Sequence, residues 1–244
     1  MEREEETTHE ELRPTKKKAE FEKELKELKS KKSYGVDIIP AELLQAHYEE
    51  IKHTLYCLII KIYTTGKIHD DFRKRIKDML TKKSKSTKCE KYRTLSILTH
   101  TSKILTKTML GRIEKKITEN LAEDLFGFRK NRGTREAILC LRNIVEKSFR
   151  VNKKVHIAFV GLLKAFDNVN WKVMMKILKM IKIDCRHRKI IREHYRHQTT
   201  SIKIKESKRD AAIRKGVRQG CNISPFLFNI YIEQAINECK EYCA

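Results

Sequence analysis

The chain has 244 residues, 40% of them hydrophobic, and its 55 Lys and Arg against 32 Asp and Glu give a formal net charge of +23. This is enough chain for one sizeable core, and no apolar run approaches the roughly 18 residues that span a membrane. The acidic residues 1–6 are unlike a signal peptide, and seven cysteines without a C-x-x-C pair indicate reduced thiols in the cytoplasm or nucleus, not secretion.

Most of the chain is predicted to be helical. Residues 1–20 are first acidic and then basic, and we expect a tail there. Apolar periodicity predicts helices over residues 17–31, 41–64 (one helix or a pair), 101–122, 134–149, 171–181 and 224–241. The helix at 134–149 should have a core-facing side made of Ala137, Ile138, Leu141, Ile144 and Val145.

Strands are expected in two places. Residues 156–160 give the clearest signal, and Ile157, Phe159 and Val160 should be buried on both sides of a sheet. Residues 201–205 and 211–217 predict a hairpin.

Four potential zinc ligands lie within thirteen residues, namely Cys185, His187, His194 and His197. The first two stand at i and i+2, which do not share a helix face. We therefore favour a basic helix over residues 186–198 that lies on the surface near nucleic acid, and we predict no metal site.

The most informative motif joins a polar turn to the last helix. Gly216 and Gly220 permit close backbone approach, and Ser224 can cap a helix that has Pro225 at its first position. The apolar side of that helix comprises Phe226, Leu227, Ile230, Tyr231 and Ile236. Together these features predict a rigid helix entrance that holds Arg218 and Gln219.

This motif, residues 216–231, resembles the template-gripping segment of reverse transcriptases from LINE-type (non-LTR) retrotransposons. Further elements of the family precede it in the chain, in the order that the family has them. They lie at residues 35–44 (G-x-D-x-I-P-x-E-L), 82–83 and 89–98 (fingers), 126–134 (G-F-R-x-x-R-G-T) and 164–171 (K-A-F-D). Collinear matches make chance a poor explanation.

The resemblance implies an α+β fold, a right-hand polymerase fragment of fingers and partial palm over residues 21–244. It would be mostly helical, with a small antiparallel palm sheet and no thumb. The partners implied are an RNA template, a DNA primer and a deoxynucleoside triphosphate (dNTP), with Mg²⁺ as the family's cofactor.

The resemblance also assigns roles to individual residues. Lys82 or Lys83 and Arg93 would contact the triphosphate, where guanidinium geometry suits phosphate. Phe166 would be the aromatic gate that excludes a ribose 2′-hydroxyl. Gln219 and Gly220 would approach the templating base pair, and template or primer contacts would come from Arg129, Arg132 and Arg218.

One departure concerns the metal site. The family pattern here is F-[IV]-D-x-x-K-A-F-D, and this chain has Gly161 at the position of the pattern's metal-binding Asp. Two-metal phosphoryl transfer needs anionic oxygens, and Asp167, six residues further on, is expected at a helix N-terminus instead. The family's Y/F-A-D-D hairpin should follow the last helix, but the sequence reaches Ala244 first. We therefore expect no intact catalytic residue and no Mg²⁺ binding.

Three readings stay open. The first is a reverse transcriptase domain of a retroelement that lacks activity. The second is a non-catalytic protein that binds RNA or DNA through its basic stretches at residues 61–91 and 203–218. The third is the unstable product of a truncated reading frame, in which the strand at 156–160 has an unpaired edge.

Overall fold

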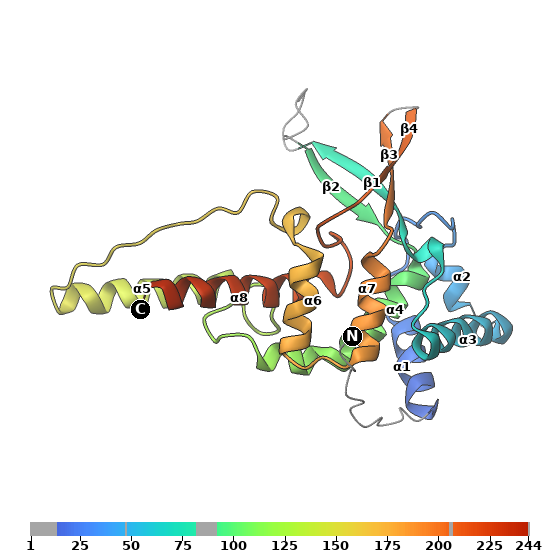
Figure 1. The fold of residues 1–244 in the computed structure, drawn as a ribbon, viewed down its shortest axis with the longest axis horizontal. Helices are drawn as coiled ribbons and strands as arrows, with labels where there is room; N and C mark the ends of the chain where they lie inside the picture. Colours follow the sequence, from blue (N-terminus) through green and yellow to red (C-terminus); the bar gives the residue numbers. More distant parts are fainter. Residues whose placement is uncertain (1–13, 47, 82–91, 205–206, 244) are drawn as a thin grey trace, which may run out of the picture.

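The computed structural model describes residues 14–46, 48–81, 92–204 and 207–243. In chain order (Figure 1), the elements are α1 (Pro14–Lys26), α2 (Ala41–Gln45), α3 (Glu49–Thr65), η1 (Asp70–Phe72), β1 (Lys74–Thr81), β2 (Tyr92–Ile97), α4 (His100–Glu119), α5 (Thr134–Arg150), η3 (Ala165–Asn168), α6 (Trp171–Met180), α7 (Cys185–Tyr195), β3 (Thr199–Ile204), β4 (Ser207–Ala212) and α8 (Ser224–Cys243). The chain is therefore mostly helical, as its periodicity predicts.

The core lies between the helices. Along α4, the buried side consists of Ile104, Leu105, Met109, Ile113 and Ile117. This helix packs against α1 and α8, while α6 and α7 pack against each other and against α8 and α3, respectively. Glu20 of α1 forms an ion pair with Arg112 of α4, so α1 joins the folded body although it begins within the predicted tail.

The sheet has the order β2-β1-β3-β4 and rises above the helices (Figure 1). The predicted hairpin is present as β3 and β4, with shifted bounds. β1 and β2 are also antiparallel, but β1 and β3 are parallel, with Lys74 opposite Thr199. The expected small antiparallel sheet is therefore not confirmed, because this central pair makes the sheet mixed. Parallel pairing is possible because the long connection through α4 to α7 can return the chain in the same direction.

α5 does not face a core. It forms with no buried residue, and Figure 1 shows it extending away from the helical body. Its apolar side is exposed instead, including Ile138, Leu139, Ile144, Val145 and Phe149. The predicted core-facing role of this helix is therefore wrong here, because none of the described elements covers it.

Residues 156–160 do not form the predicted strand. They run extended between α5 and η3 without ladder pairing, and Phe159 is 86% exposed. A strand needs a partner for its backbone N–H and C=O groups, and no described strand lies beside this segment.

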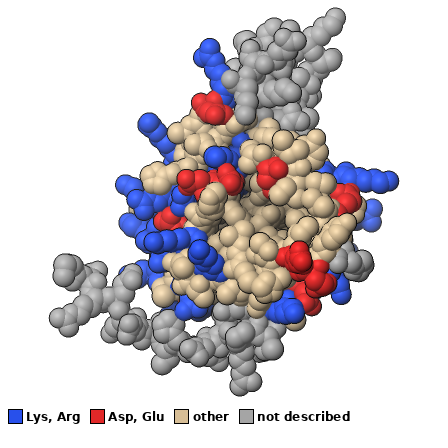
Figure 2. Space-filling view, turned by 90° about the vertical axis from the view of Figure 1, so that its right-hand side faces the viewer, with Lys and Arg blue, Asp and Glu red and all other residues tan. Residues whose placement is uncertain are grey.

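None of the helices within the described ranges is long and apolar enough to cross a bilayer. Both signs of charge appear on the side of the molecule formed by α1, α2 and α3 (Figure 2). In that view, Lys and Arg gather toward the left edge, while Asp and Glu are scattered among uncharged residues.

Candidate functional site

The turn that precedes α8 is held against η3 by its backbone. Gly216 has φ +91°, its N–H donates to the Val169 carbonyl at 2.8 Å, and the Val217 N–H donates to the Phe166 carbonyl at 2.8 Å. A Cβ on Gly216 would lie only 2.8 Å from Asp167 Cα. Trp171 Nε1 also donates to the Gly216 carbonyl, at 2.7 Å. Glycine is therefore required where the turn meets the K-A-F-D element.

The other side of the turn meets the end of β2 and the start of α4. The Ser96 N–H donates to the Gln219 carbonyl at 3.3 Å, and a Cβ on Gly220 would lie 3.0 Å from the Ser96 carbonyl oxygen. Asn222 Nδ2 donates to the Lys103 carbonyl at 3.3 Å. The turn thus joins segments that lie far apart in the sequence.

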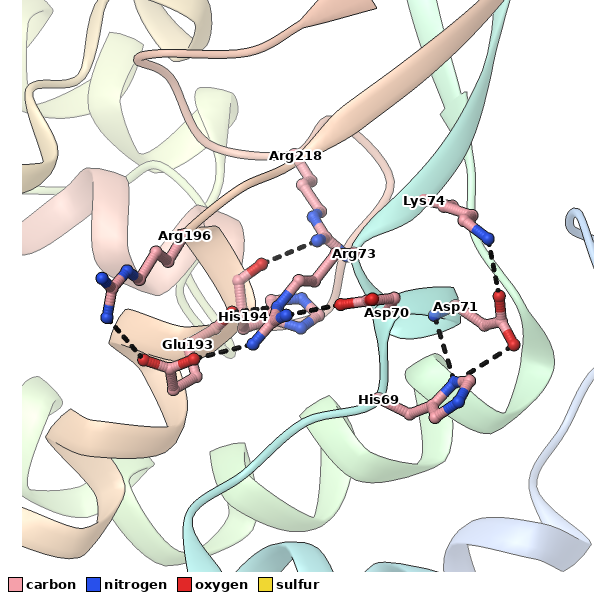
Figure 3. Close-up of polar contacts among 9 residues, drawn as sticks. All are labelled: His69, Asp70, Asp71, Arg73, Lys74, Glu193, His194, Arg196 and Arg218. Atoms are coloured by element: carbon pink, nitrogen blue, oxygen red, sulfur yellow. Dashed lines mark hydrogen bonds and ion pairs between the residues drawn. The ribbon is translucent and has the colours of Figure 1, made fainter.

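Arg218 lies inside the protein, with none of its surface exposed. Its Nη1 donates to the Phe72 carbonyl at 2.9 Å. Its Nη2 donates to the His194 carbonyl at 2.7 Å (Figure 3). A second guanidinium, that of Arg75, is also buried nearby; burial, and then the charge of Arg218, lower the pKa of Arg75 to about 10. The guanidinium that the sequence assigns to the template or primer therefore faces the interior and ties the turn to η1 and α7.

Ion pairs continue this connection between η1 and α7 (Figure 3). Arg73 Nη2 lies 2.7 Å from Glu193 Oε2, and Arg73 Nη1 lies 2.6 Å from Asp70 Oδ1. Next to this pair, the His194 ring is buried, and burial, reinforced by the charge of Arg218, holds the pKa of His194 well below its usual range. A neutral imidazole therefore sits among cationic groups.

A cavity of about 810 Å³ opens beside the turn. Three residues that the sequence assigns to nucleotide binding, Phe166, Gln219 and Gly220, line it together. Lys107, Phe128 and Lys130 also line it, and the sequence analysis did not assign them a role there. Phe128 belongs to the G-F-R element. That element could have indicated Phe128, but only its arginines were assigned a contact.

Three aromatic residues, Phe128, Phe166 and Phe226, line this cavity, and Phe228 packs behind Phe166. The ring centroid of Phe166 lies 4.7 Å from that of Phe228 and 5.7 Å from that of Phe128. Phe128 has φ +53° and is 58% exposed. Its ring is therefore accessible beside that of Phe166.

Two other arginines predicted to contact template or primer, Arg129 and Arg132, donate to backbone carbonyls of their own loop. Arg129 Nη1 donates to the Ala122 carbonyl at 2.6 Å, and Arg132 Nη1 donates to the Glu123 carbonyl. Both arginines brace the loop after α4, and their contact with template or primer stays a prediction. Lys82, Lys83 and the side chain of Arg93 lie outside the described residues.

The residues present do not fit a two-Mg²⁺ site. Gly161 lies exposed in the extended segment, with no atom within 4 Å of a Cβ built on it, and it offers no side-chain oxygen. Asp167 is exposed in η3, where its backbone packs against Gly216. The described part of the chain contains no group of three His, Cys, Asp or Glu residues that could hold a metal ion.

The basic helix predicted at 186–198 is present as α7, but one side of it is buried. His187 and His194 are buried, whereas Cys185 is exposed. Burial also lowers the pKa of His187. These histidines contribute to the core side of an amphipathic helix and do not converge with Cys185 on an ion.

Comparisons with known proteins agree with the motif order. A family model described as reverse transcriptase (RNA-dependent DNA polymerase) matches residues 80–244. A 115 kDa protein in the type-1 retrotransposable element R1DM of Drosophila melanogaster is 24% identical, over 88% of this chain and 21% of its own length. The transposon TX1 149 kDa protein of Xenopus laevis is 22% identical, over 83% and 16%, respectively.

A third relative is the retrovirus-related Pol polyprotein from the type-1 retrotransposable element R2 of Popillia japonica. It is 25% identical, over 59% of this chain and 20% of its own length. The chain therefore spans about a fifth of the length of these relatives.

Proposed function

Because this chain belongs to the reverse transcriptase (RNA-dependent DNA polymerase) family, we propose that its cavity binds a nucleotide at the end of a primer–template duplex. The observation that carries this proposal is the convergence of Phe166, Gln219 and Gly220 on one cavity. These residues belong to two motifs about 50 residues apart in the sequence, and hydrogen bonds between the motifs fix their relative position.

The chemistry of the cavity suits a nucleotide. Apolar rings contact sugars and bases well, and a few polar groups then fix orientation. Here Phe166 supplies the ring on which a deoxyribose would lie, and a 2′-hydroxyl on that sugar would be crowded. Gln219 supplies a side-chain amide. Lys107 and Lys130 also line the cavity, but both are paired with carboxylates of the same lining, Lys107 with Glu24 and Glu27, and Lys130 with Glu114.

We further propose that this chain binds without polymerising. Transfer of a nucleotidyl group by two metal ions requires carboxylates that bridge the ions, and Gly161 removes the one that the K-A-F-D motif should carry. The charge distribution supports a second, related candidate: a nucleic-acid-binding protein that makes no use of the cavity. Its net charge of +23 favours any polyanion.

Discrimination between deoxyribose and ribose separates these candidates. In the presence of primer–template, a fluorescent dNTP analogue should bind more tightly than the matched ribonucleotide. Phe166→Val should reduce that preference, because the gate is gone, while Phe149→Val on the distant α5 should leave it unchanged. Equal binding of both sugars by the wild-type chain, or a preference unaffected by Phe166→Val, would exclude the nucleotide site and leave the second candidate.

A further inference from the structure

We propose that a groove between the end of α3 and α7 binds the phosphate backbone of a nucleic acid, as a second surface separate from the nucleotide cavity. The groove has a volume of about 360 Å³ and shares no lining residue with that cavity. Five cations line it, Arg186, Arg188, Lys189, Arg192 and Arg196, and we call it the α7 groove.

The cations lie together because of the amphipathic pattern of α7. Ile190, Ile191 and Tyr195 are buried on the core side of this helix. Lys189, Arg192 and Arg196 stand at i, i+3 and i+7. This spacing places them on one side of the helix, away from the core side. They span about 10 Å of helix axis, a length that can meet more than one phosphate of a nucleic acid strand.

Negative groups near the groove are already partnered. Glu193 is the one carboxylate among its lining residues, and its Oε2 lies 2.7 Å from Arg73 Nη2, while Arg196 Nη1 lies 3.6 Å from its Oε1. The C-terminal carbonyls of α3 would disfavour an anion, but Lys189 Nζ donates to the Thr65 carbonyl at 3.1 Å. The groove therefore has an excess of positive charge.

Two of the arginines are available for a ligand. Within the described ranges, neither Arg186 nor Arg192 forms an ion pair with a carboxylate. By contrast, Arg188 Nε donates to the Ile183 carbonyl at 2.9 Å and helps to end the turn before α7. Arg186 and Arg192 are accordingly the residues to change in a test, because their replacement should not disturb the fold.

The lining favours nucleic acid over a protein partner. Protein interfaces depend on buried aromatic and aliphatic anchors, and the α7 groove is lined by no large apolar side chain. Contacts with a phosphate backbone come mainly from arginine and lysine and need no apolar centre. The proposal goes beyond the nucleotide site, since it requires neither the cavity nor polymerisation.

The test compares Arg186→Gln/Arg192→Gln with a control that removes the same charge from α5, Arg135→Gln/Lys147→Gln. The probe is a fluorescent 20-nucleotide single strand of mixed sequence, measured by anisotropy at several salt concentrations. We expect the α7 double variant to bind about tenfold more weakly at low salt. The slope of log K against log salt should fall by about 1.4, because each phosphate that is no longer neutralised lowers it by about 0.7.

The control should weaken binding less than twofold and keep the wild-type slope. Equal weakening in both variants would show a general charge effect and overturn the proposal, as would unchanged binding in both. Competition by a polyglutamate peptide stronger than by an oligonucleotide of the same charge would point to an acidic protein and also overturn it. Sugar discrimination in the cavity should be unchanged in the α7 variant, so failure of the nucleotide site is detected separately.

Discussion

Arg218 Nη2 donates to the carbonyl oxygen of His194 at 2.7 Å in the interior of the protein. The residue after Arg218 is Gln219, which lines the cavity, so this bond connects the last turn of α7 to the position of a proposed nucleotide-binding residue. The same guanidinium holds the Phe72 carbonyl. Arg218 thus holds the turn that carries Gln219, and its contact with template or primer stays a prediction.

Replacement of Arg218 should therefore destabilise the protein. Arg218→Met removes the hydrogen bonds to the Phe72 and His194 carbonyls, and among the described residues only the His194 carbonyl keeps another donor, Gln198 Nε2. Hydrogen bonds to charged groups contribute about 1.5–3 kcal/mol each. We expect a loss of about 3 kcal/mol in the free energy of unfolding by urea, and a smaller loss for Arg218→Lys, which can serve one carbonyl. Arg135→Met on exposed α5 should change stability by less than about 0.5 kcal/mol. Similar losses for both methionine variants would contradict this stabilising role of Arg218.

Stability should fall as the pH decreases below neutrality. Burial lowers the pKa of His194 in the folded protein, so the unfolded chain, with a pKa of about 6.5, binds a proton first. The stabilisation is complete above pH ~6.5 and is lost as the pH falls toward the folded pKa. Urea unfolding between pH 7.5 and 5.5 should show this decline, and His194→Gln should make it shallower. A smaller decline should remain, because burial also lowers the pKa of His187 and of His100. The exposed His53→Gln variant should keep the wild-type profile; a flat wild-type profile would refute the assignment.

Substitution of Gly216 should destabilise the protein. Gly216→Ala would place a Cβ 2.8 Å from the backbone of Asp167 at φ +91°, and we expect a loss of about 2 kcal/mol from strain and displacement of η3. Gly111→Ala is the matched control, because it lies within α4 with nothing within 4 Å of its added Cβ. There, alanine should stabilise by ~0.5–1 kcal/mol. Thermal melts of the two variants should shift in opposite directions.

Phe128 should contribute to nucleic acid binding by stacking. Its ring is exposed at the cavity beside Phe166, and base–aromatic stacking contributes about 1–3 kcal/mol per base. Phe128→Ala should therefore weaken primer–template binding by about tenfold or more, while Phe128→Trp should preserve it. Phe149→Ala removes an even more exposed ring, at 87%, and should have no effect. Equal behaviour of both alanine variants would contradict a stacking role.

Sequence periodicity predicted most helices, because burial of one apolar side is a local pattern. It failed where burial depends on a partner. α5 has an apolar side like that of α6, but α6 packs against α7 and α8, whereas no described element covers α5. The strand predicted at residues 156–160 is absent for the same reason, because no described strand lies beside this segment. An exposed apolar surface of this size favours self-association.

The sequence assigned several residues to one site, and their roles in nucleotide binding stay predictions. Motif order assigned Phe166 and Gln219 to one site, and the cavity brings them together. Arg218 was assigned to the same ligand surface, but its two acceptors are the carbonyls of Phe72 and His194, from η1 and α7. No local pattern shows that a guanidinium will turn toward carbonyls so distant in the sequence. β1 and β2 were missed because neither sequence alternates regularly between apolar and polar residues, and half of the residues in β1 are charged.

Primer extension on an RNA template tests the central claim most directly, that this family member binds without polymerising. Purified protein, first shown to bind the primer–template by anisotropy, is supplied with all four dNTPs and with Mg²⁺ or Mn²⁺. Because Gly161 cannot supply the bridging carboxylate, we predict no extension above a heat-inactivated control with either metal. Extended primer from the bound complex would contradict the account and would require a metal ligand other than the residue at position 161.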